Sequence, residues 1–198
     1  MALTDRAGTG QSLAPCASET ALEPTTAPAS PEGTVLNFAY GSNLLTRRIL
    51  QRVPSARVVC VATLAAHRLC WHKRGRDGSG KCDVLPTGDP LDRVIGVIYG
   101  MALADKALLD RVEGLGEGYR EKEVLLATAA GPMRAWTYCA TEIDARLAPF
   151  TWYKALVVAG AREHGFPTAY LAELEAIPAC TDADSARARL HFGLAGAP

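Results

Sequence analysis

The chain has no excess of either charge, because 21 lysine and arginine residues balance 21 aspartate and glutamate residues. A chain without a basic excess gives no reason to expect nucleic acid or an anionic membrane as a partner. Long hydrophobic runs are also missing, which excludes a membrane-spanning helix. The N-terminus has no basic segment followed by an apolar one, so we expect a cytoplasmic protein without a secretory signal.

Patterns that bind metals are absent as well. The six cysteines form no C-x-x-C pair, and the four histidines are scattered. We therefore expect reduced thiols, most of them buried in strands, and no metal or other cofactor. The residues concerned are Cys16, Cys60, Cys70, Cys82, Cys139, Cys180, His67, His72, His164 and His191.

One segment imitates a nucleotide-binding loop. Residues 75–81 read Gly-Arg-Asp-Gly-Ser-Gly-Lys, which fits the spacing G-x-x-x-x-G-K. A phosphate-binding loop also needs Ser or Thr after the lysine and then a helix. Here Cys82 follows, and the next residues are strand-like and end at Pro86. We expect no ATP or GTP site, and we assign the segment to a flexible loop near a cavity mouth.

Basic residues gather around this loop. A solvated surface explains such a cluster, and a substrate carboxylate nearby would fit it too. The cluster comprises His72, Lys73, Arg74, Arg76 and Lys81.

The chain divides into a polar N-terminal segment and one folded domain. Residues 1–34 are rich in Ala, Thr, Ser, Pro and Gly without periodicity, which predicts a disordered tail. A start codon placed too far upstream would give the same composition. Residues 35–198 are enough for one domain with a sizeable core.

Within residues 35–198, strands and helices do not repeat as β–α–β units. This order predicts an α+β fold with a small mixed, partly closed β-barrel-like sheet, flanking helices and a C-terminal helical segment. Strands are expected near 35–39, 57–71 (one bent strand or two), 82–85, 94–99, 123–128 and 133–139, and helices after residue 43 and near 105–112, 150–164, 169–177 and 182–190.

The segment Phe38-Ala39-Tyr40-Gly41-Ser42-Asn43-Leu44 is the most informative part of the chain. It predicts an apolar strand that enters a tight turn and then a helix with Ser42 or Asn43 as N-cap. Gly41 permits a sharp turn and close approach to the backbone. Outward-facing N–H groups at such a turn favour an anionic or carbonyl oxygen.

Two more motifs follow in order. Leu109-Asp110-Arg111-Val112-Glu113-Gly114 ends a short helix and precedes Tyr119, and Trp152-Tyr153-Lys154 leads through a helix to His164 and Gly165. Together with Tyr-Gly-Ser-Asn-Leu, these motifs resemble the gamma-glutamylcyclotransferase family. The similarity runs from about residue 36 to about residue 177.

The resemblance implies an enzyme that converts a gamma-glutamyl amide, from an amino acid or an amine, to 5-oxoproline and the free amine. It places the catalytic glutamate at Glu113, whereas Glu117, Glu121 and Glu123 have charged neighbours and are expected to be solvated. The expected substrate-binding residues are Tyr40, Gly41, Ser42, Asn43, Leu44, Tyr119 and Tyr153. Tyr138 is assigned to the core, and no metal is expected.

Subfamily and alternatives remain open at this point. Glutathione-specific relatives carry Gly-Ser-Leu in the first motif, and relatives acting on lysine amines carry Gly-Thr-Leu. By analogy, Gly-Ser-Asn-Leu is closer to enzymes that act on gamma-glutamyl amino acids or on gamma-glutamyl-protected intermediates. A second hypothesis is a non-catalytic binding module of the same fold. A third is an acyl-transfer hydrolase with Ser42 or a cysteine as nucleophile, although no G-x-S-x-G motif is present. The leaving amine is left open, and so is a homodimer.

Overall fold

The computed structural model describes residues 33–196. Five strands form a closed barrel in the order β1-β5-β2-β6-β7, and two more form a separate hairpin. The barrel strands are β1 (Thr34–Ala39), β2 (Arg57–Ala65), β5 (Arg93–Ala102), β6 (Tyr119–Thr128) and β7 (Gly131–Ala140), and the hairpin strands are β3 (His67–Arg74) and β4 (Gly80–Pro86).

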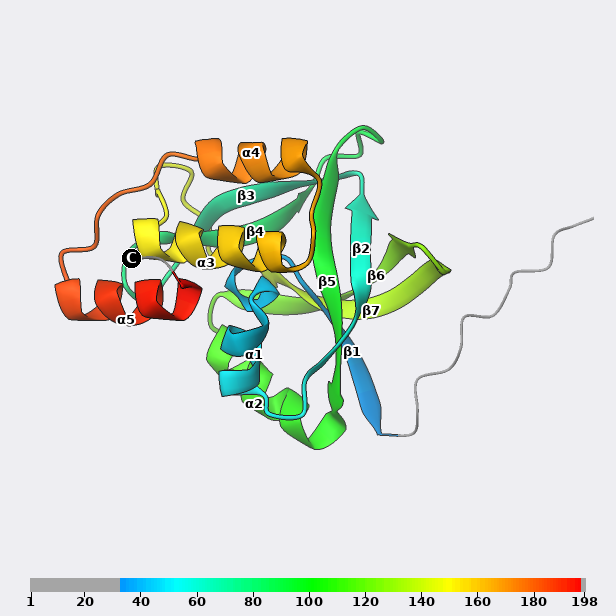
Figure 1. The fold of residues 1–198 in the computed structure, drawn as a ribbon. Helices are drawn as coiled ribbons and strands as arrows, with labels where there is room; N and C mark the ends of the chain where they lie inside the picture. Colours follow the sequence, from blue (N-terminus) through cyan, green and yellow to red (C-terminus); the bar gives the residue numbers. More distant parts are fainter. Residues whose placement is uncertain (1–32, 197–198) are drawn as a thin grey trace, which may run out of the picture.

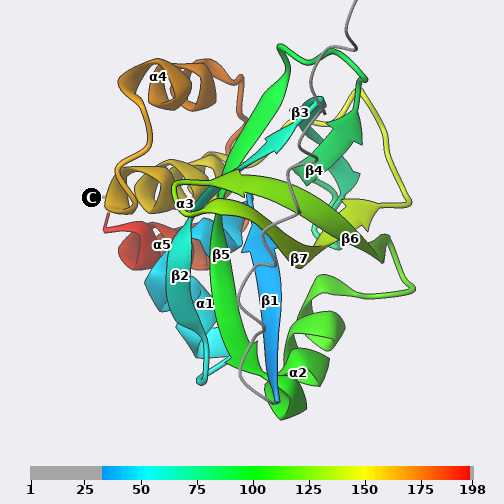
Figure 2. The ribbon, with the colours of Figure 1, turned by 90° about the vertical axis from the view of Figure 1, so that its right-hand side faces the viewer.

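The first strand closes the barrel. β1 pairs antiparallel with β5 over its whole length and meets β7 in parallel at Asn37 and Trp136. The Asn37 amide donates to the Trp136 carbonyl at 3.2 Å, and the Thr137 hydroxyl donates to the Phe38 carbonyl at 2.9 Å. Figure 2 shows β1 lying between β5 and β7. These contacts fix the end of β1 and therefore the direction in which the chain enters the next turn.

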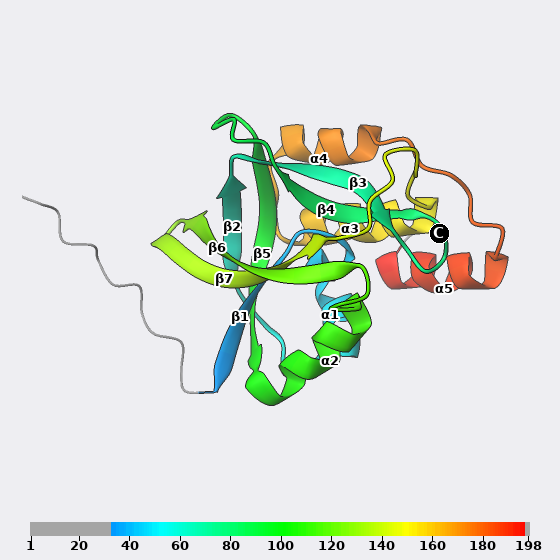
Figure 3. The same ribbon diagram turned by 180° about the vertical axis from the view of Figure 1, so that it is seen from behind.

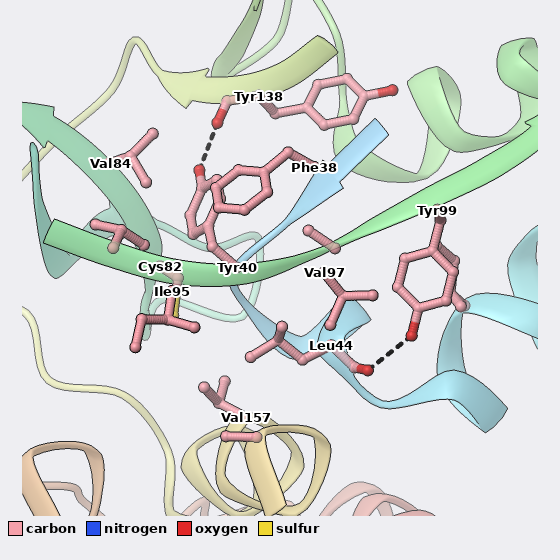
Figure 4. Packing of buried hydrophobic residues seen from close by; sticks show 14 of the residues in the cluster. Phe38, Tyr40, Leu44, Cys82, Val84, Ile95, Val97, Tyr99, Tyr138 and Val157 are labelled. Atoms are coloured by element: carbon pink, nitrogen blue, oxygen red, sulfur yellow. Dashed lines mark hydrogen bonds between the residues drawn. The ribbon is translucent and has the colours of Figure 1, made fainter. Parts of the chain in front are cut away.

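The core fills the barrel and continues beneath the helices. β5 is buried at every position except its two end residues, because the barrel interior lies on one side and helices cover the other. This burial explains its unbroken apolar run. Figure 4 shows Phe38 on one side of β5 and Ile95 and Val97 on the other, where Val157 of a neighbouring helix faces them.

The helices lie in two groups. Figure 1 shows α3 between α4 and α5 on one side of the barrel, while α1 and α2 lie at one end. Seen from behind, β6 and β7 cross in front of the remaining barrel strands (Figure 3). The helices are the 3₁₀ turn η1 (Ser42–Leu44), α1 (Thr46–Arg52), α2 (Leu103–Glu113), α3 (Thr151–Glu163), α4 (Thr168–Ala176) and α5 (Ser185–Ala195).

The structure confirms the predicted α+β class, and the sheet is a closed barrel. The stretch 57–71 is two strands, which belong to different sheets. The hairpin predicted around residues 130–132 is present as β6 and β7. The last helix begins and ends later than predicted, at Ser185 and Ala195.

The apolar residues of α2 are not all buried. Helical spacing places Leu108, Leu109 and Val112 on one face, but only Leu109 is buried, with Leu108 and Val112 exposed. The helix instead turns Lys106 inward beside Leu109. Lys106 forms ion pairs with Asp110 and Glu121, so the buried side of α2 is partly polar.

The predicted tail lies almost entirely outside the described residues. Its last residue, Thr34, begins β1, and the Gly33 carbonyl accepts a hydrogen bond from the Leu103 N–H at 2.8 Å. Cys16 also lies outside the described range. Among residues 33–196, every helix is too short or too polar to cross a bilayer.

Candidate active site

The turn after β1 is held by close packing around Gly41. A β-carbon at Gly41 would lie 3.1 Å from the Cys82 β-carbon and 3.1 Å from the Tyr153 hydroxyl. On the other side, a β-carbon at Gly160 of α3 would lie 2.4 Å from the Leu45 nitrogen. Two glycines therefore let β4 and α3 press directly on the turn, which fixes its backbone.

The predicted N-cap at Ser42 or Asn43 is wrong. These residues begin the short turn η1, and α1 begins at Thr46 without a side-chain cap. The reason lies in their side chains, which bind elsewhere: Ser42 Oγ accepts from Arg48 Nε at 3.0 Å, and Asn43 binds two residues of the site described next.

Glu113 lies beside this turn, at the C-terminal end of α2. The Asn43 amide donates to Glu113 Oε1 at 2.8 Å, and Arg52 Nη1 donates to the same oxygen at 3.0 Å. Arg52 Nη1 also donates to Asn43 Oδ1 at 2.7 Å, which closes a triangle of three side chains. Within the described chain both recorded partners bind Oε1, so Oε2 is left for a further group.

α2 ends in a way that presents Glu113. Gly114 adopts the left-handed conformation with φ 72°, and its N–H returns to the Arg111 carbonyl. Glycine is the residue that enters this conformation without strain, and it commonly ends helices. The chain turns away directly after Glu113, so the side chain stands at the edge of a cavity, with 17% of it exposed.

An inner cavity of about 40 Å³ opens above the turn. Glu113 is the only carboxylate among the described residues that line it. The lining consists of residues 37–43 together with Cys82, Glu113, Tyr119, Tyr138 and Tyr153. The structure therefore brings together Tyr40, Gly41, Ser42, Asn43, Glu113, Tyr119 and Tyr153, all of which the sequence singled out.

Three of the four tyrosine hydroxyls that line the cavity are hydrogen-bonded to backbone groups. Tyr119 donates to the Cys82 carbonyl at 2.8 Å, the Cys82 N–H donates to the Tyr153 oxygen at 3.1 Å, and Tyr40 donates to the Tyr138 carbonyl. Figure 4 shows the last of these bonds. Burial raises the pKa of Tyr40, Tyr119 and Tyr153 well above the ordinary value. These hydroxyls stay protonated and act as neutral hydrogen-bonding groups.

Tyr138 belongs to the site rather than to the core alone. It lines the inner cavity, and its hydroxyl donates to Asp110 Oδ1 at 2.6 Å. Burial, and next the hydrogen bond to Asp110, raise the pKa of Tyr138. Glu121 is not solvated as predicted, because it pairs with buried Lys106 in the same cluster. Glu117 and Glu123 are exposed and pair with arginines, as expected of solvated residues.

Leu44 lies apart from the other turn residues. Its side chain is 1% exposed and belongs to the hydrophobic core, and its N–H already donates to the Gly41 carbonyl at 2.9 Å. Its carbonyl accepts from the Tyr99 hydroxyl at 2.8 Å, as Figure 4 shows, and lies 2.9 Å from His164 Nε2. Leu44 therefore anchors the turn to β5 and α3.

The cavity offers no activated nucleophile of its own. Burial raises the pKa of the Cys82 thiol, which opposes formation of a reactive thiolate. Ser42 Oγ accepts from the Arg48 guanidinium, which cannot serve as a base. No histidine lines the inner cavity in the part of the chain that the structure describes. This arrangement speaks against the acyl-transfer hydrolase.

A wider outer groove of about 260 Å³ adjoins the inner cavity and shares Ser42, Glu113, Tyr119 and Tyr153 with it. The groove contains Gly75, Arg76 and Asp77, so the 75–81 loop lies at the cavity mouth as predicted. Lys81 Nζ donates to Asp77 Oδ2 and Ser79 Oγ, both at 2.7 Å. The lysine that imitates a phosphate-binding residue is thus held by its own loop.

Sequence reasoning missed Arg48, Arg52, Cys82 and Tyr138 as site residues. Arg48 and Arg52 are four residues apart on α1, so they share one face of that helix. This spacing, directly after the turn, is a signal that could have identified them. Cys82 and Tyr138 reach the cavity through tertiary contacts with Gly41 and Tyr40, for which the local sequence carries no signal.

Comparisons with known proteins support the resemblance. The AIG2-like family matches residues 93–174, which include Glu113, Tyr119 and Tyr153. Human gamma-glutamylcyclotransferase is 36% identical over 151 residues, which cover 74% of this chain and 80% of the relative. The chain belongs to the gamma-glutamylcyclotransferase family.

Further relatives of this family agree. Mouse gamma-glutamylcyclotransferase is 35% identical over 157 residues, covering 73% of this chain and 79% of the relative. A solved structure of a gamma-glutamyl cyclotransferase superposes with a TM-score of 0.69 at 34% identity, over 74% of this chain and 89% of that chain. The barrel and its helices are therefore the fold of the gamma-glutamylcyclotransferase family.

Proposed function

We propose that this chain is a cyclotransferase that converts a gamma-glutamyl amide to 5-oxoproline and a free amine. One observation carries the proposal. Glu113, which lines the inner cavity, is fixed through Oε1 by Asn43 of the turn and by Arg52, and Oε2 has no recorded partner among the described residues. A fixed carboxylate with one free oxygen is suited to proton transfer.

The substrate supplies its own nucleophile. Its α-amine attacks the γ-carbonyl carbon, a carbon–nitrogen bond forms, and a five-membered ring closes. The bond between that carbon and the leaving nitrogen then breaks. Because the amine is tethered to the carbonyl, much of the entropic cost of bringing the groups together is already met.

Glu113 moves the proton in this scheme. It accepts a proton from the α-amine as the amine attacks, and it returns the proton to the leaving nitrogen as the old bond breaks. The hydroxyls of Tyr119 and Tyr153 cannot serve as the base. Burial raises their pKa values, so they already hold their protons. No cofactor, metal or water takes part in the balance of atoms.

The turn supports the charge that develops on the substrate. The first N–H groups of a helical turn have no partner within it. Ser42 and Asn43, whose amides stand at the start of η1, line the cavity beside Glu113. We assign them, with Tyr40, Gly41, Tyr119 and Tyr153, to binding the γ-carbonyl oxygen and the carboxylate of the glutamyl group.

Several finer expectations stay predictions. These are a place in glutathione metabolism, a cytoplasmic location and a homodimer. The first is tested by including glutathione among the substrates, the second by cell fractionation, and the third by light scattering on the purified protein.

The identity of the product tests the proposed function. Incubation with gamma-glutamyl-alanine is expected to yield 5-oxoproline and alanine, with no glutamate formed directly. The same peptide acetylated on its α-amine should give no product, because its nucleophile is blocked. Direct release of glutamate, or of acetyl-glutamate from the blocked peptide, would show a hydrolase. Binding of the peptide without any turnover would favour the non-catalytic module.

A further inference from the structure

The outer groove is strongly basic, but most of its cations already have a carboxylate partner. Arg52 pairs with Glu113, Arg76 with Glu117, and Lys81 with Asp77. Arg187 likewise pairs with Asp182 and Asp184, which lie just outside the groove. Within each pair the two charges neutralise each other, so these cations do not by themselves require an anionic ligand.

Lys73 differs from those cations. It is 8% exposed, and the structure records neither an ion pair nor a hydrogen bond for its ammonium among the described residues. Its nitrogen keeps some contact with solvent in the groove, since Glu121 Oε1 is the one fully buried polar side-chain atom without a hydrogen-bond partner among the described residues. Burial lowers the pKa of Lys73, and the charge of Glu113 acts in the opposite direction. Lys73 is thus a nearly buried cation that lines the groove and lacks a partner of its own.

The surroundings of Lys73 hold its ammonium at the junction of groove and cavity. Nζ lies 4.6 Å from the centre of the Tyr119 ring, and Tyr119 lines both spaces. A β-carbon at Gly118 would lie 3.1 Å from the same nitrogen. The ammonium therefore packs against two consecutive residues, Gly118 and the ring of Tyr119.

A second cation lies across the shared region. Arg48 is also 8% exposed, and its recorded partners are neutral: Ser42 Oγ at 3.0 Å and His191 Nδ1 at 3.3 Å. Burial lowers the pKa of Arg48 to about 10, and the nearby charge of Arg52 adds to this shift. Among the described residues that line the outer groove, Lys73 and Arg48 are thus the two cations without a carboxylate partner.

We propose that Lys73 determines substrate specificity by pairing with a carboxylate on the leaving amine. This inference rests on the proposed function, which places the glutamyl group in the inner cavity and the leaving group in the outer groove. The pairing with Lys73 would distinguish a substrate whose leaving group is an amino acid from one whose leaving group is a plain amine. The proton transfer at Glu113 is the same for both. Lys73 is a specificity residue here, because it touches the part of the substrate that does not react.

A matched pair of substrates tests the inference without any variant. Gamma-glutamyl-alanine and gamma-glutamyl-alaninamide differ only in replacement of the leaving group's carboxylate by a neutral amide. A hydrogen bond between charged groups is worth about 1.5–3 kcal/mol, so we expect kcat/KM to be roughly tenfold or more higher for the acid. Equal kcat/KM for the two substrates would overturn the inference while leaving the proposed function intact.

Variants assign the effect to Lys73. Lys73→Met should lower kcat/KM for the acid by about tenfold, mainly through KM, and should leave the amide substrate unchanged. Lys73→Arg should retain the preference, and Arg76→Gln, which changes an exposed, paired cation of the same groove, is the control. Lys73→Gln replaces the Met variant if that protein does not fold.

Each remaining outcome has a distinct meaning. Equal loss with both substrates in Lys73→Met would show a structural role and reject the specificity role. The same selective loss in Arg76→Gln would assign the preference to the general field of the groove. Absence of 5-oxoproline from both substrates with the wild-type protein would overturn the proposed function, and the role of Lys73 with it.

Discussion

At the scale of single residues, the two carboxylate oxygens of Glu113 differ in their hydrogen bonds. Oε1 is bound by Asn43 and Arg52, which fix the side chain, and Oε2 has no recorded partner among the described residues. A carboxylate held by one oxygen can exchange a proton at the other without losing its position. This arrangement explains why Asn43 serves the site better as a bridge than as a helix cap.

Glu113→Gln tests this arrangement. Glutamine keeps the size of the side chain and can still accept at its amide oxygen, but it cannot take up a proton. General acid–base catalysis contributes about 10²–10⁴-fold, so the rate of 5-oxoproline formation should fall by roughly that factor. The melting temperature should stay close to that of the wild type. Glu117→Gln, at an exposed glutamate of the same groove, is the control, and a folded Glu113→Gln protein with normal activity would reject Glu113 as the base.

At the scale of elements, α5 covers one wall of the outer groove although none of its residues is buried. His191 of α5 stacks on Trp152 of α3 with ring centres 4.1 Å apart, and the Trp152 indole N–H donates to Asp182 at 2.8 Å. Arg187 binds the same Asp182 through Nε and Nη2, both at 2.6 Å. These polar and aromatic contacts hold the helix in place together with apolar residues that are partly buried against the core, namely Ala188, Phe192, Leu194 and Ala195.

These contacts predict a dependence of stability on pH. Burial, and next the charges of Arg48 and Lys81, lower the pKa of His191 from 6.5 to about 4. Between these two values the unfolded chain binds a proton that the folded chain does not, so stability should rise with pH across this window. Chemical unfolding at the two ends of the window measures the effect. His191→Phe should flatten the slope, and His67→Gln, at the start of β3, should not; an unchanged slope in His191→Phe would contradict the assignment.

At the scale of the whole molecule, the first described residues already belong to the barrel, because β1 begins at Thr34. Gly33 and Thr34 are already tied to the start of α2 and to β5. The composition of residues 1–32 offers few large apolar side chains. Removal of residues 1–32, with Gly33 retained, should therefore change neither the melting temperature nor the activity. Calorimetry and the 5-oxoproline assay measure both, and a clear loss in either would show that this segment contributes to the domain.

Much of this architecture could be predicted from local sequence. Strand β5 is a continuous apolar run, the turn at Gly41 follows an apolar strand, and Glu113 precedes a helix-ending glycine. Each of these signals depends on neighbours within a few residues, where periodicity and turn chemistry are informative.

Other features depend on distant contacts and could not be predicted in this way. The closure of the barrel requires β1 to meet β7. The prediction of an N-cap at Ser42 or Asn43 was wrong because these side chains bind Arg48 and Glu113 instead. The exposure of Leu108 and Val112 depends on how α2 lies against the barrel. Helical periodicity indicates that two sides of a helix differ, but packing decides which one is buried.

The closure of the barrel by its first strand also has a consequence for biosynthesis. Asn37 and its partner Trp136 are 99 residues apart, Asn43 and Glu113 are 70 apart, and Leu44 and His164 are 120 apart. The ribosome releases β1 long before the segments that complete it, and such distant contacts form slowly. A nascent chain that ends before α3 therefore contains all the barrel strands, the turn and Glu113, but it lacks Tyr153 and the contacts of Gly160 and His164 that hold the turn in place.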